Sequence, residues 1–376
     1  MSYIAAGNTT TTSLTLNADT TGNLIFTTGG ANTTALTLSN AQVATFSGNV
    51  TAQSVTTTSS TGSVNSINTF GFKNRIINGN MVIDQRNAGV ISTPASGAYT
   101  LDRWYAQTSS ASKISVQQVS GGPAGFTKYL AVTVASAVTV GASDFFNIAQ
   151  AIEGYNIADL GWGAAGAATV TLSFWVYSNI TGSFGGSLQN TGQATSYPFL
   201  YTISSANTWT QISLTIPGPT IGTWNTTNGI GILVKFSLGA GQYNGTAGSW
   251  SNNLYLGATG EGSIMASTSN YMYFTGVQLE SGSQATSFDF RDYGRELMLC
   301  QRYYEVSGQL YGSPAAAGFG YVTWSFKVDK RTSPTVTYGT SSNVTTGAIA
   351  VGSVNSYVAA TSNPLINSNS TAVAEL

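Results

Sequence analysis

The feature that most constrains this chain is a series of short alternating segments between residues 110 and 280. Each is a handful of residues rich in Val, Ile, Tyr, Phe, Trp and Thr, bounded by Gly, Asn, Ser or Pro. Such segments predict an all-β fold, most nearly a jelly-roll β-sandwich of about eight strands or more. The segments are Ile114–Val119, Tyr129–Val134, Val170–Tyr177, Phe199–Ile203, Trp209–Ile216, Ile230–Phe236 and Tyr271–Leu279.

The segment from Thr171 to Tyr177 shows how one of these strands divides its side chains. Successive residues of a strand point to opposite faces of the sheet. Leu172, Phe174 and Val176 therefore share one face, and Thr171, Ser173, Trp175 and Tyr177 share the other. A face that carries Trp and Tyr but no charge is either covered by a second packed layer or a ligand surface.

Charged residues are scarce, at 7% of the chain, with 13 Lys and Arg against 14 Asp and Glu and no histidine. An ordinary soluble domain carries about 25%. Acid–base catalysis needs titratable groups near their working pKa, and nucleic-acid binding needs a cluster of Lys and Arg, so both are disfavoured. An uncharged polar surface with 19 Tyr, 16 Phe and 7 Trp instead suits a stiff β-protein that binds neutral surfaces such as sugars.

The sequence also bears on compartment and assembly. Residues 1–4 show no basic region followed by an apolar stretch, so we expect no secretory signal, and no run of about 20 apolar residues predicts a membrane span. Cys300 is the single cysteine, which leaves no intrachain disulfide. A net charge of −1 invites aggregation unless an assembly hides the strand edges, which points to an oligomer.

Residues 1–65 are nearly all Thr, Ser, Asn, Gly and Ala, interrupted by short apolar alternations. Leu14–Leu16, Leu24–Phe26, Leu36–Leu38 and Val43–Phe46 are expected to be very short strands. The stretches from Leu14 to Phe26 and from Leu36 to Phe46 resemble two imperfect copies of one unit. One such unit cannot bury its apolar side alone, so we expect an intertwined trimeric β shaft; the alternative is a flexible low-complexity linker.

The stretch from Phe290 to Tyr304 changes period and predicts a short helix. Apolar residues recur there at steps of three and four, the pattern of a helix that faces a seam. So short and polar a helix is marginal alone, and it fits either a three-helix contact on a symmetry axis or a cap packed on the sandwich. Cys300 is then a small buried hydrophobe rather than a nucleophile. The expected trimer seam is Phe290, Tyr293, Leu297, Cys300 and Tyr304.

Beyond residue 312 the chain is β-like again. Residues 320–328 and 334–338 alternate cleanly and predict a small C-terminal β module. The expected organisation is an N-terminal shaft over residues 1–70 and a jelly-roll domain over 71–288. A short helix over 289–306 and a C-terminal β module over 307–376 follow.

Several segments resemble the core motifs of bacteriophage tail fibre proteins, over roughly residues 73–305. The resemblance implies a homotrimer on the virion tail that carries a jelly roll like those of carbohydrate-binding modules. The first 70 residues match no motif, although their Ser/Thr/Gly style is similar to fibre shafts. The segments that carry the resemblance are Asn74–Asn80, Tyr99–Trp104, Ser173–Val176, Gly276–Glu280, Ala285–Arg291 and Glu296–Tyr304.

From the resemblance we expect a receptor-binding protein that attaches a phage to a glycan of the host cell surface, and from the scarcity of titratable groups we expect it not to be an enzyme. Residues 1–70 would dock to other virion tail proteins, and the fibre would be assembled in the host bacterial cytoplasm. No nucleic acid, membrane insertion or cofactor is expected. The alternatives are a purely structural connector of the tail or baseplate and a polysaccharide depolymerase.

The carboxylates divide into three groups. Those beside the motif segments lie next to arginines and are expected to pair with them and to clamp the ends of the sandwich, whereas Asp19, Glu261, Asp329 and Glu375 are expected to be solvated. Asp144, Glu153 and Asp159 lie mid-domain. Glycoside cleavage by Glu153 and Asp159 requires two carboxyl groups about 5–10 Å apart, and a structural calcium could bind Asp144, Asp159 and backbone carbonyls.

Sugar binding needs exposed aromatic faces flanked by amide and hydroxyl groups. Trp224, Tyr243 and Trp250 are surrounded by Gly, Asn and Ser, which favours exposed loops, whereas Trp104 and Trp175 lie in expected strands and are better core candidates. The alternative for each ring is the core or the trimer interface. The expected glycan-binding residues are Trp224, Asn225, Gln242, Tyr243, Trp250 and Asn252.

Overall fold

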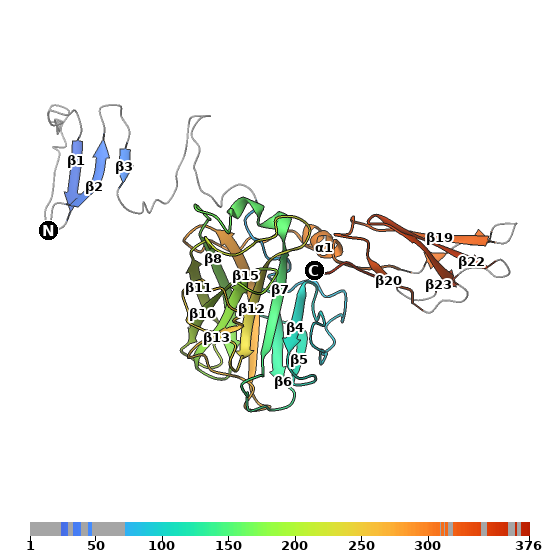
Figure 1. The fold of residues 1–376 in the computed structure, drawn as a ribbon, viewed down its shortest axis with the longest axis horizontal. Helices are drawn as coiled ribbons and strands as arrows, with labels where there is room; N and C mark the ends of the chain where they lie inside the picture. Colours follow the sequence, from blue (N-terminus) through green and yellow to red (C-terminus); the bar gives the residue numbers. More distant parts are fainter. Residues whose placement is uncertain are drawn as a thin grey trace, which may run out of the picture. The chain divides into compact units, whose positions relative to one another are not determined.

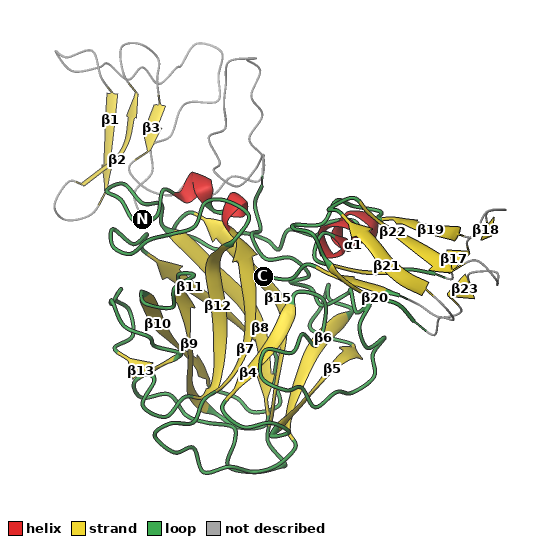
Figure 2. Ribbon diagram, turned by 45° about the vertical axis from the view of Figure 1, so that its right-hand side comes forward, coloured by secondary structure: helices red, strands yellow, loops and turns green. Residues whose placement is uncertain are grey.

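A computed structural model describes residues 24–28, 33–38, 44–46, 72–308, 310–311, 313–314, 319–339, 344–359, 365–366 and 370–376. The chain divides into two compact units, residues 1–65 and residues 66–376. Strands, yellow in Figure 2, form nearly all of the regular structure, and the helices, red, are short. The expectation of a mainly β fold is confirmed. No helix in these described ranges is long and apolar enough to span a membrane.

In the first unit the described residues form one antiparallel three-stranded sheet. It consists of β1 (Leu24–Thr28), β2 (Thr33–Leu38) and β3 (Ala44–Phe46), in that order. Leu24 pairs with Leu38 and Leu36 with Phe46, so the apolar alternation does form strands that meet one another. The strand expected at Leu14–Leu16 lies outside the described residues, and the intertwining of three chains stays a prediction.

Two five-stranded antiparallel sheets dominate the second unit (Figure 1). Sheet I has the order β11-β8-β15-β6-β5 and sheet II the order β10-β9-β12-β7-β4. In sheet I the strands are β5 (Ile114–Ser120), β6 (Lys128–Val134), β8 (Val170–Ser178), β11 (Thr210–Ile216) and β15 (Tyr271–Ser281). In sheet II they are β4 (Trp104–Thr108), β7 (Phe146–Glu153), β9 (Gly182–Gln189), β10 (Ser196–Ile203) and β12 (Ile230–Gly239).

The chain passes repeatedly from one sheet to the other, as in a jelly roll, so that both sheets share one core. Phe174 of sheet I packs edge-on against Phe236 of sheet II, with ring centroids 4.9 Å apart, and Leu172 and Val176 flank it fully buried. The inward face expected for β8 is therefore confirmed. All seven expected segments form strands.

Three strands of the sandwich, β4, β7 and β9, were not expected from the sequence. The glycine-rich sequence of β9 hides the alternation that marks the other strands. Its Gly186 is required by packing, because a Cβ there would run into the Lys235 carbonyl oxygen and the ring of Phe199. Glycine in a strand often marks such a close approach.

Smaller elements complete the sandwich. Two single-turn 3-10 helices, η1 (Gly154–Asn156) and η2 (Ala158–Leu160), follow β7. The two-residue strands β13 (Asn244–Gly245) and β14 (Gly257–Ala258) pair in parallel within the connection from β12 to β15.

The helix α1 (Tyr293–Gln301) is shorter than the expected stretch, and the Asp292 side chain caps it by accepting from the Arg295 amide. Cys300 is fully buried against Ile77 and Ile83, so α1 is a cap packed on its own chain. The expectation of a continuous trimer seam is wrong for two of its members. Cys300 is enclosed within one chain, and Tyr304 is 8% exposed in a strand beyond the helix.

The other members of the expected seam differ in their exposure. Leu297 packs against the cluster around Cys300, whereas Phe290 and Tyr293 are 56% and 62% exposed in the single chain. These two rings are the members of the seam that a second chain could contact.

The region after the helix forms small antiparallel sheets. Strand β24 (Thr371–Val373) lies between β16 (Tyr304–Val306) and β20 (Thr335–Thr337). Trp324, Phe326, Val354 and Ala372 form its core, which confirms the β character expected there. The other strands are β17 (Leu310–Tyr311), β18 (Ser313–Pro314), β19 (Phe319–Ser325), β21 (Val344–Ile349), β22 (Ser353–Ala359) and β23 (Leu365–Ile366).

Candidate functional site

The segments that resemble tail fibre motifs meet in one polar network inside the chain. The Asn74 side chain bonds three backbone groups, those of Ile76, Val277 and Leu279. The Trp104 indole N–H donates to the Asn78 carbonyl at 3.0 Å. The bonds to Val277 and Leu279 join segments about 200 residues apart in sequence, so these motifs build the sandwich rather than a ligand site.

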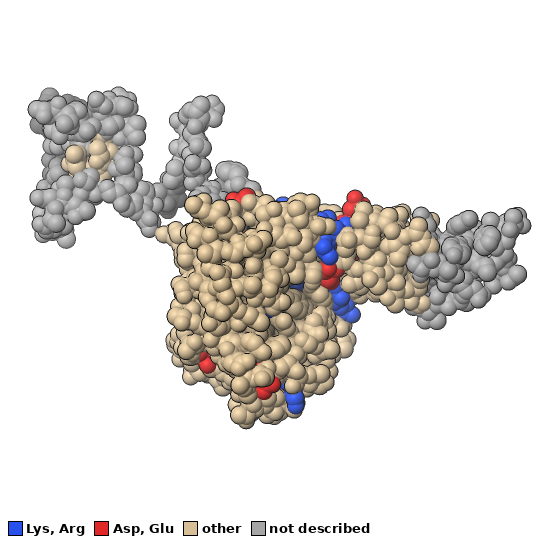
Figure 3. Space-filling model, viewed as in Figure 1, with Lys and Arg blue, Asp and Glu red and all other residues tan. Residues whose placement is uncertain are grey.

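Charged side chains gather where the sandwich meets α1 and the C-terminal strands (Figure 3). We call this set the junction network: Arg86 and Arg103 with Glu375, Arg302 with Glu153, and Arg291 with Asp289 and Glu296. The expectation that carboxylates beside the motifs pair with arginines holds for Asp289 and Glu296, which bind Arg291. Glu305 instead pairs with Lys330, and Asp102 accepts from Gln85.

Two carboxylates expected to be solvated are not. Glu375 is 7% exposed and binds both Arg86 and Arg103. Glu261 accepts hydrogen bonds from the Ser237 hydroxyl and the Ala258 amide, and burial raises the pKa of its carboxyl group. Both lie in polar, flexible-looking sequence contexts, so nothing local in the sequence indicated their partners.

The three mid-domain carboxylates are engaged with the protein itself. Arg302 and the Tyr303 hydroxyl bind Glu153, and Arg75 binds Asp159 with both of its terminal nitrogens. Asp144 accepts from the Gly141 amide and the Ser109 hydroxyl. Within the described ranges no group of three or more Asp, Glu, His or Cys side chains is arranged to hold a metal ion.

The tryptophans expected in exposed loops pack together instead. Trp224 and Trp250 lie 5.4 Å apart and both contact Trp162. Trp224 is only 7% exposed, so the expectation of an exposed ring there is wrong, and Trp250 is half-buried. Their indole N–H groups donate to the Ile221 and Pro217 carbonyls, which anchors the loops.

The remaining expected glycan-binding residues differ in their surroundings. The Asn225 side chain accepts from Thr227 in a local turn, and Tyr243 packs edge-on against Phe145. Gln242 and Asn252 are exposed, and Asn252 accepts a hydrogen bond from Thr195. Whether any of the six binds sugar stays a prediction.

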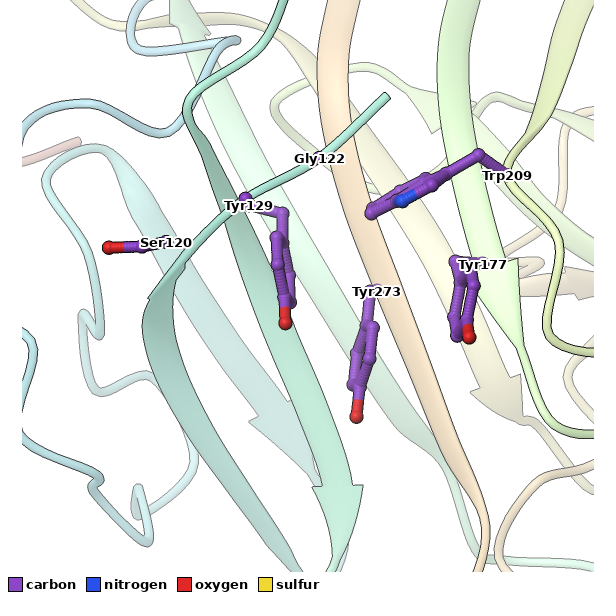
Figure 4. A pocket seen from close by; sticks show the side chains of 7 residues that line it. Ser120, Gly122, Tyr129, Tyr177, Trp209 and Tyr273 are labelled. Atoms are coloured by element: carbon purple, nitrogen blue, oxygen red, sulfur yellow. The ribbon is translucent and has the colours of Figure 1, made fainter. Parts of the chain in front are cut away.

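The outer face of sheet I carries an open aromatic site, which we call the tyrosine groove. Four rings lie on it, one from each of four adjacent chain segments: Tyr129 of β6, Tyr273 of β15, Tyr177 of β8 and Trp209 just before β11 (Figure 4). All four are half-buried. The groove has a volume of about 280 Å³ and is lined by Ser120, Gly121, Gly122, Tyr129, Tyr177, Trp209 and Tyr273.

The strand register creates this row of rings. Tyr273 pairs directly with Tyr177, and Tyr129 is two residues from Ala131, the partner of Tyr273 on the other side. Alternation then directs all three phenol rings to the face opposite the core. Their planes are nearly parallel: 2° between Tyr273 and Tyr177, with centroids 5.6 Å apart, and 28° between Tyr273 and Tyr129, with centroids 5.0 Å apart.

Trp209 lies across the row and contacts the rings at both of its ends. Its ring is inclined by 49° to Tyr177 and by 70° to Tyr129, with centroids 5.3 and 5.5 Å away. Gly121 and Gly122, at φ +117° and +138°, carry the chain past Tyr129 without a side chain. No residue that lines the groove is charged.

The surroundings favour the protonated hydroxyl at two positions of the groove, Tyr273 and Tyr129. Burial and the neighbouring phenols raise the pKa of Tyr273 to about 12 and raise that of Tyr129. Each hydroxyl can therefore both donate and accept a hydrogen bond. The groove offers uncharged hydroxyls and aromatic surface, which is the chemistry that sugars require.

The sequence indicated part of this site. The expected alternation placed Trp175 and Tyr177 on the face opposite Leu172, and both rings are half-buried there, although Trp175 was also expected to be a better core candidate. Tyr129, Trp209 and Tyr273 were not proposed. Tyr273 lies between buried Met272 and Phe274, and Tyr129 precedes buried Leu130, so their alternation was visible in the sequence. Which strands are neighbours was not.

A second open cavity of about 300 Å³ lies where the edge strands β10 and β11 approach each other. Tyr197, Phe199, Leu214 and Ile216 line it with small residues between them. It lacks the row of free hydroxyls that distinguishes the tyrosine groove, so it is the weaker candidate for a sugar site.

Comparison with known proteins gives distant structural likenesses alone. No protein-family model matches the chain, and no curated protein matches it. Among solved structures, a putative sugar binding protein from Bacteroides thetaiotaomicron aligns at 11% identity and a TM-score of 0.34, covering 56% of this chain and 100% of that one. The family 11 carbohydrate-binding module of a Clostridium thermocellum cellulase aligns at 12% and 0.26, covering 53% and 98%.

The enzymatically active domain of tailspike protein 4 from bacteriophage CBA120 aligns at 12% identity and a TM-score of 0.30. The alignment covers 56% of this chain but only 21% of that one. Scores this low carry no weight, so the class of the protein is defined by its own fold and site: a β-sandwich with an uncharged aromatic groove on an outer sheet face.

Proposed function

We propose that this protein binds glycans through the tyrosine groove. The single observation that carries the proposal is the uncharged row of Tyr129, Tyr273, Tyr177 and Trp209 on an open sheet face. Amphipathic rings of this kind combine an apolar body with a polar tip, which matches the C–H and hydroxyl surfaces of a sugar. The low charge of the chain as a whole supports the same class of ligand.

We further propose that the protein is a phage tail fibre that attaches the virion to a glycan of the host cell surface. The order of motifs between residues 73 and 305 supports this role, as does the exposure of Phe290 and Tyr293, where a second copy could pack. In a homotrimer anchored through residues 1–70, three weak sites would act together, since linked binding events raise the effective concentration.

The experiment is binding of the purified full-length chain to a glycan array and to intact bacteria, with its mass measured by sedimentation. The proposal predicts a trimer that recognises a defined set of glycans and adheres to cells displaying them. A chain that binds no glycan and no cell would contradict it. That result would favour the purely structural connector, whose surfaces contact only other virion proteins.

The depolymerase alternative makes a different prediction, the shortening of host polysaccharide by the purified chain. The ion pairs of Glu153 with Arg302 and of Asp159 with Arg75 favour structural roles for both carboxylates. If Glu153→Gln and Asp159→Asn variants lost a shortening activity while still binding glycan, these residues would be catalytic. We propose that the protein is not an enzyme.

A further inference from the structure

We infer that the tyrosine groove selects an uncharged, extended glycan chain, which lies across the strands and is recognised by a row of tyrosine hydroxyls. This inference rests on the proposed function and adds the class of glycan and the way in which it is held.

The first step concerns the faces of the rings. Tyr273 lies between Tyr129 and Tyr177, with its ring nearly parallel to both (Figure 4). Centroid separations of 5.0 and 5.6 Å leave no space for a sugar ring between two phenols. The faces of Tyr273 are thus occupied by its neighbours, and a glycan meets the edges and hydroxyls of the row. Of the four rings, Trp209 alone is not parallel to its neighbour.

The second step concerns the hydroxyls. The three phenol oxygens point in the same direction in Figure 4, and in the described part of the chain none of them has a hydrogen-bond partner. The neighbouring Tyr271 differs, because its hydroxyl donates to the Asn207 side chain at 2.7 Å. The three groove tyrosines therefore share hydroxyls that are available to a ligand, which is not true of every tyrosine on this face.

The third step concerns spacing. The rings come from adjacent segments, so the row crosses the strands and each ring is one strand further along it. The distance between neighbouring strands is comparable to the length of one sugar unit in an extended glycan. Successive sugars of a linear chain would thus meet successive tyrosines, and at least three units are needed to contact all of them.

The fourth step concerns charge. The cation next to the groove in sequence, Lys128, pairs across the strands with Ser120 and donates to the Ser120 hydroxyl at 2.9 Å. In Figure 4 the Ser120 hydroxyl points away from the tyrosines. The tyrosine row itself thus carries no cation that would stabilise a uronate, a sialate or a phosphate. Moving such an anion from water onto this face would cost free energy without compensation.

The test uses the full-length chain and isothermal titration with neutral oligosaccharides of glucose, galactose, mannose and N-acetylglucosamine, from one to six units. Oligogalacturonates and sialylated glycans of the same lengths are the acidic probes. We expect a neutral series to bind with an affinity that rises up to three or four units and then levels off. Binding restricted to acidic glycans, or an affinity independent of length, would overturn the inference while leaving glycan binding itself intact.

Single tyrosine variants then test the hydroxyls. Tyr129→Phe, Tyr177→Phe and Tyr273→Phe each keep the ring and remove one hydroxyl, so each should weaken binding about threefold to tenfold. Tyr271→Phe is the matched control, since its hydroxyl serves Asn207, and it should bind as the wild type does. Unchanged affinity in all three groove variants would overturn the role of the hydroxyls. Absence of binding by the wild-type chain to every probe would overturn the proposed function as well.

Discussion

The tyrosine groove and the junction network use the composition of this chain in opposite ways. The groove lies open on sheet I, consists of aromatic and small residues, and carries no charge. The junction network gathers charged residues in pairs such as Arg103 with Glu375, and most of their side chains are buried, although Arg302 and Asp289 remain 31% and 30% exposed. A chain with 7% charged residues thus uses charge mainly for architecture, and leaves recognition to neutral groups.

The physical reason is the different cost of burying the two kinds of group. A charge can be buried only when it is paired and hydrogen-bonded, and such a pair fixes the geometry of the segments that it joins. Arg103 illustrates this, since it binds Glu375 and the Ala151 carbonyl and lies 3.6 Å from the centre of the Tyr303 ring. Neutral phenols can remain half-exposed at no such cost.

The largest expected effect comes from Arg103→Ala. Removal of one partner of a buried ion pair leaves Glu375 without its fully buried partner, and this typically costs about 3–5 kcal/mol. We expect the free energy of unfolding, measured by chemical denaturation, to fall by that amount. Glycan affinity measured well below the new midpoint should be unchanged.

The control is Arg295→Ala, which removes an exposed arginine that caps nothing with its side chain. It should alter stability by less than about 0.5 kcal/mol. A loss of glycan binding by folded Arg103→Ala protein would contradict the separation between the two regions.

The outer face of sheet II sharpens the comparison, because Lys235 is buried there and, among the residues that the structure describes, donates to one partner, the Gln193 side-chain oxygen. Burial lowers the pKa of Lys235 from 10.5 to about 7. Between these values the unfolded chain holds a proton that the folded chain has released, so stability should rise with pH over that range.

Lys235→Met removes this titration and fills similar space. Denaturation measured at intervals between pH 7 and pH 9 should show the rise in stability for the wild type and a weaker dependence for the variant, which should also be the more stable protein at pH 7. If the stability of the two proteins depended on pH in the same way, Lys235 would not release a proton on folding, which would contradict its buried position in the structure.

The smallest expected effect is that of salt on glycan binding. Screening acts on charges, and the groove has none. The dissociation constant for a neutral oligosaccharide should therefore change less than about twofold when the ionic strength rises from about 0.05 to 0.5 M. A steep loss of affinity with salt would place the bound glycan against charged side chains, away from the groove.

The sequence predicted the elements better than it predicted the site. Period-two alternation marked the strands of sheet I, and the outward direction of Trp175 and Tyr177 followed from it. The sequence did not predict β9, because this strand packs through glycines and lacks the alternation of apolar side chains. Trp224 was misplaced because polar neighbours in sequence do not reveal that Trp162 and Trp250 surround the ring in space.

The groove itself required the register between strands that are far apart in the chain. Tyr177 and Tyr273 are separated by nearly a hundred residues and pair directly, and nothing local in either strand specifies this partnership. The same holds for Glu375, whose arginine partners lie near the start of the sandwich. Long-range pairing therefore determines both the recognition surface and the ion pairs.

The most direct measurement is the dissociation constant for a neutral oligosaccharide in two matched variants of the full-length chain, Trp209→Ala and Trp250→Ala. Both remove one half-buried indole, the first from the tyrosine groove and the second from the cluster with Trp162 and Trp224. The account predicts that Trp209→Ala weakens binding at least tenfold while Trp250→Ala, once shown to be folded, binds as the wild type does. Loss of binding in Trp250→Ala with full affinity in Trp209→Ala would contradict it and place the site in the loops.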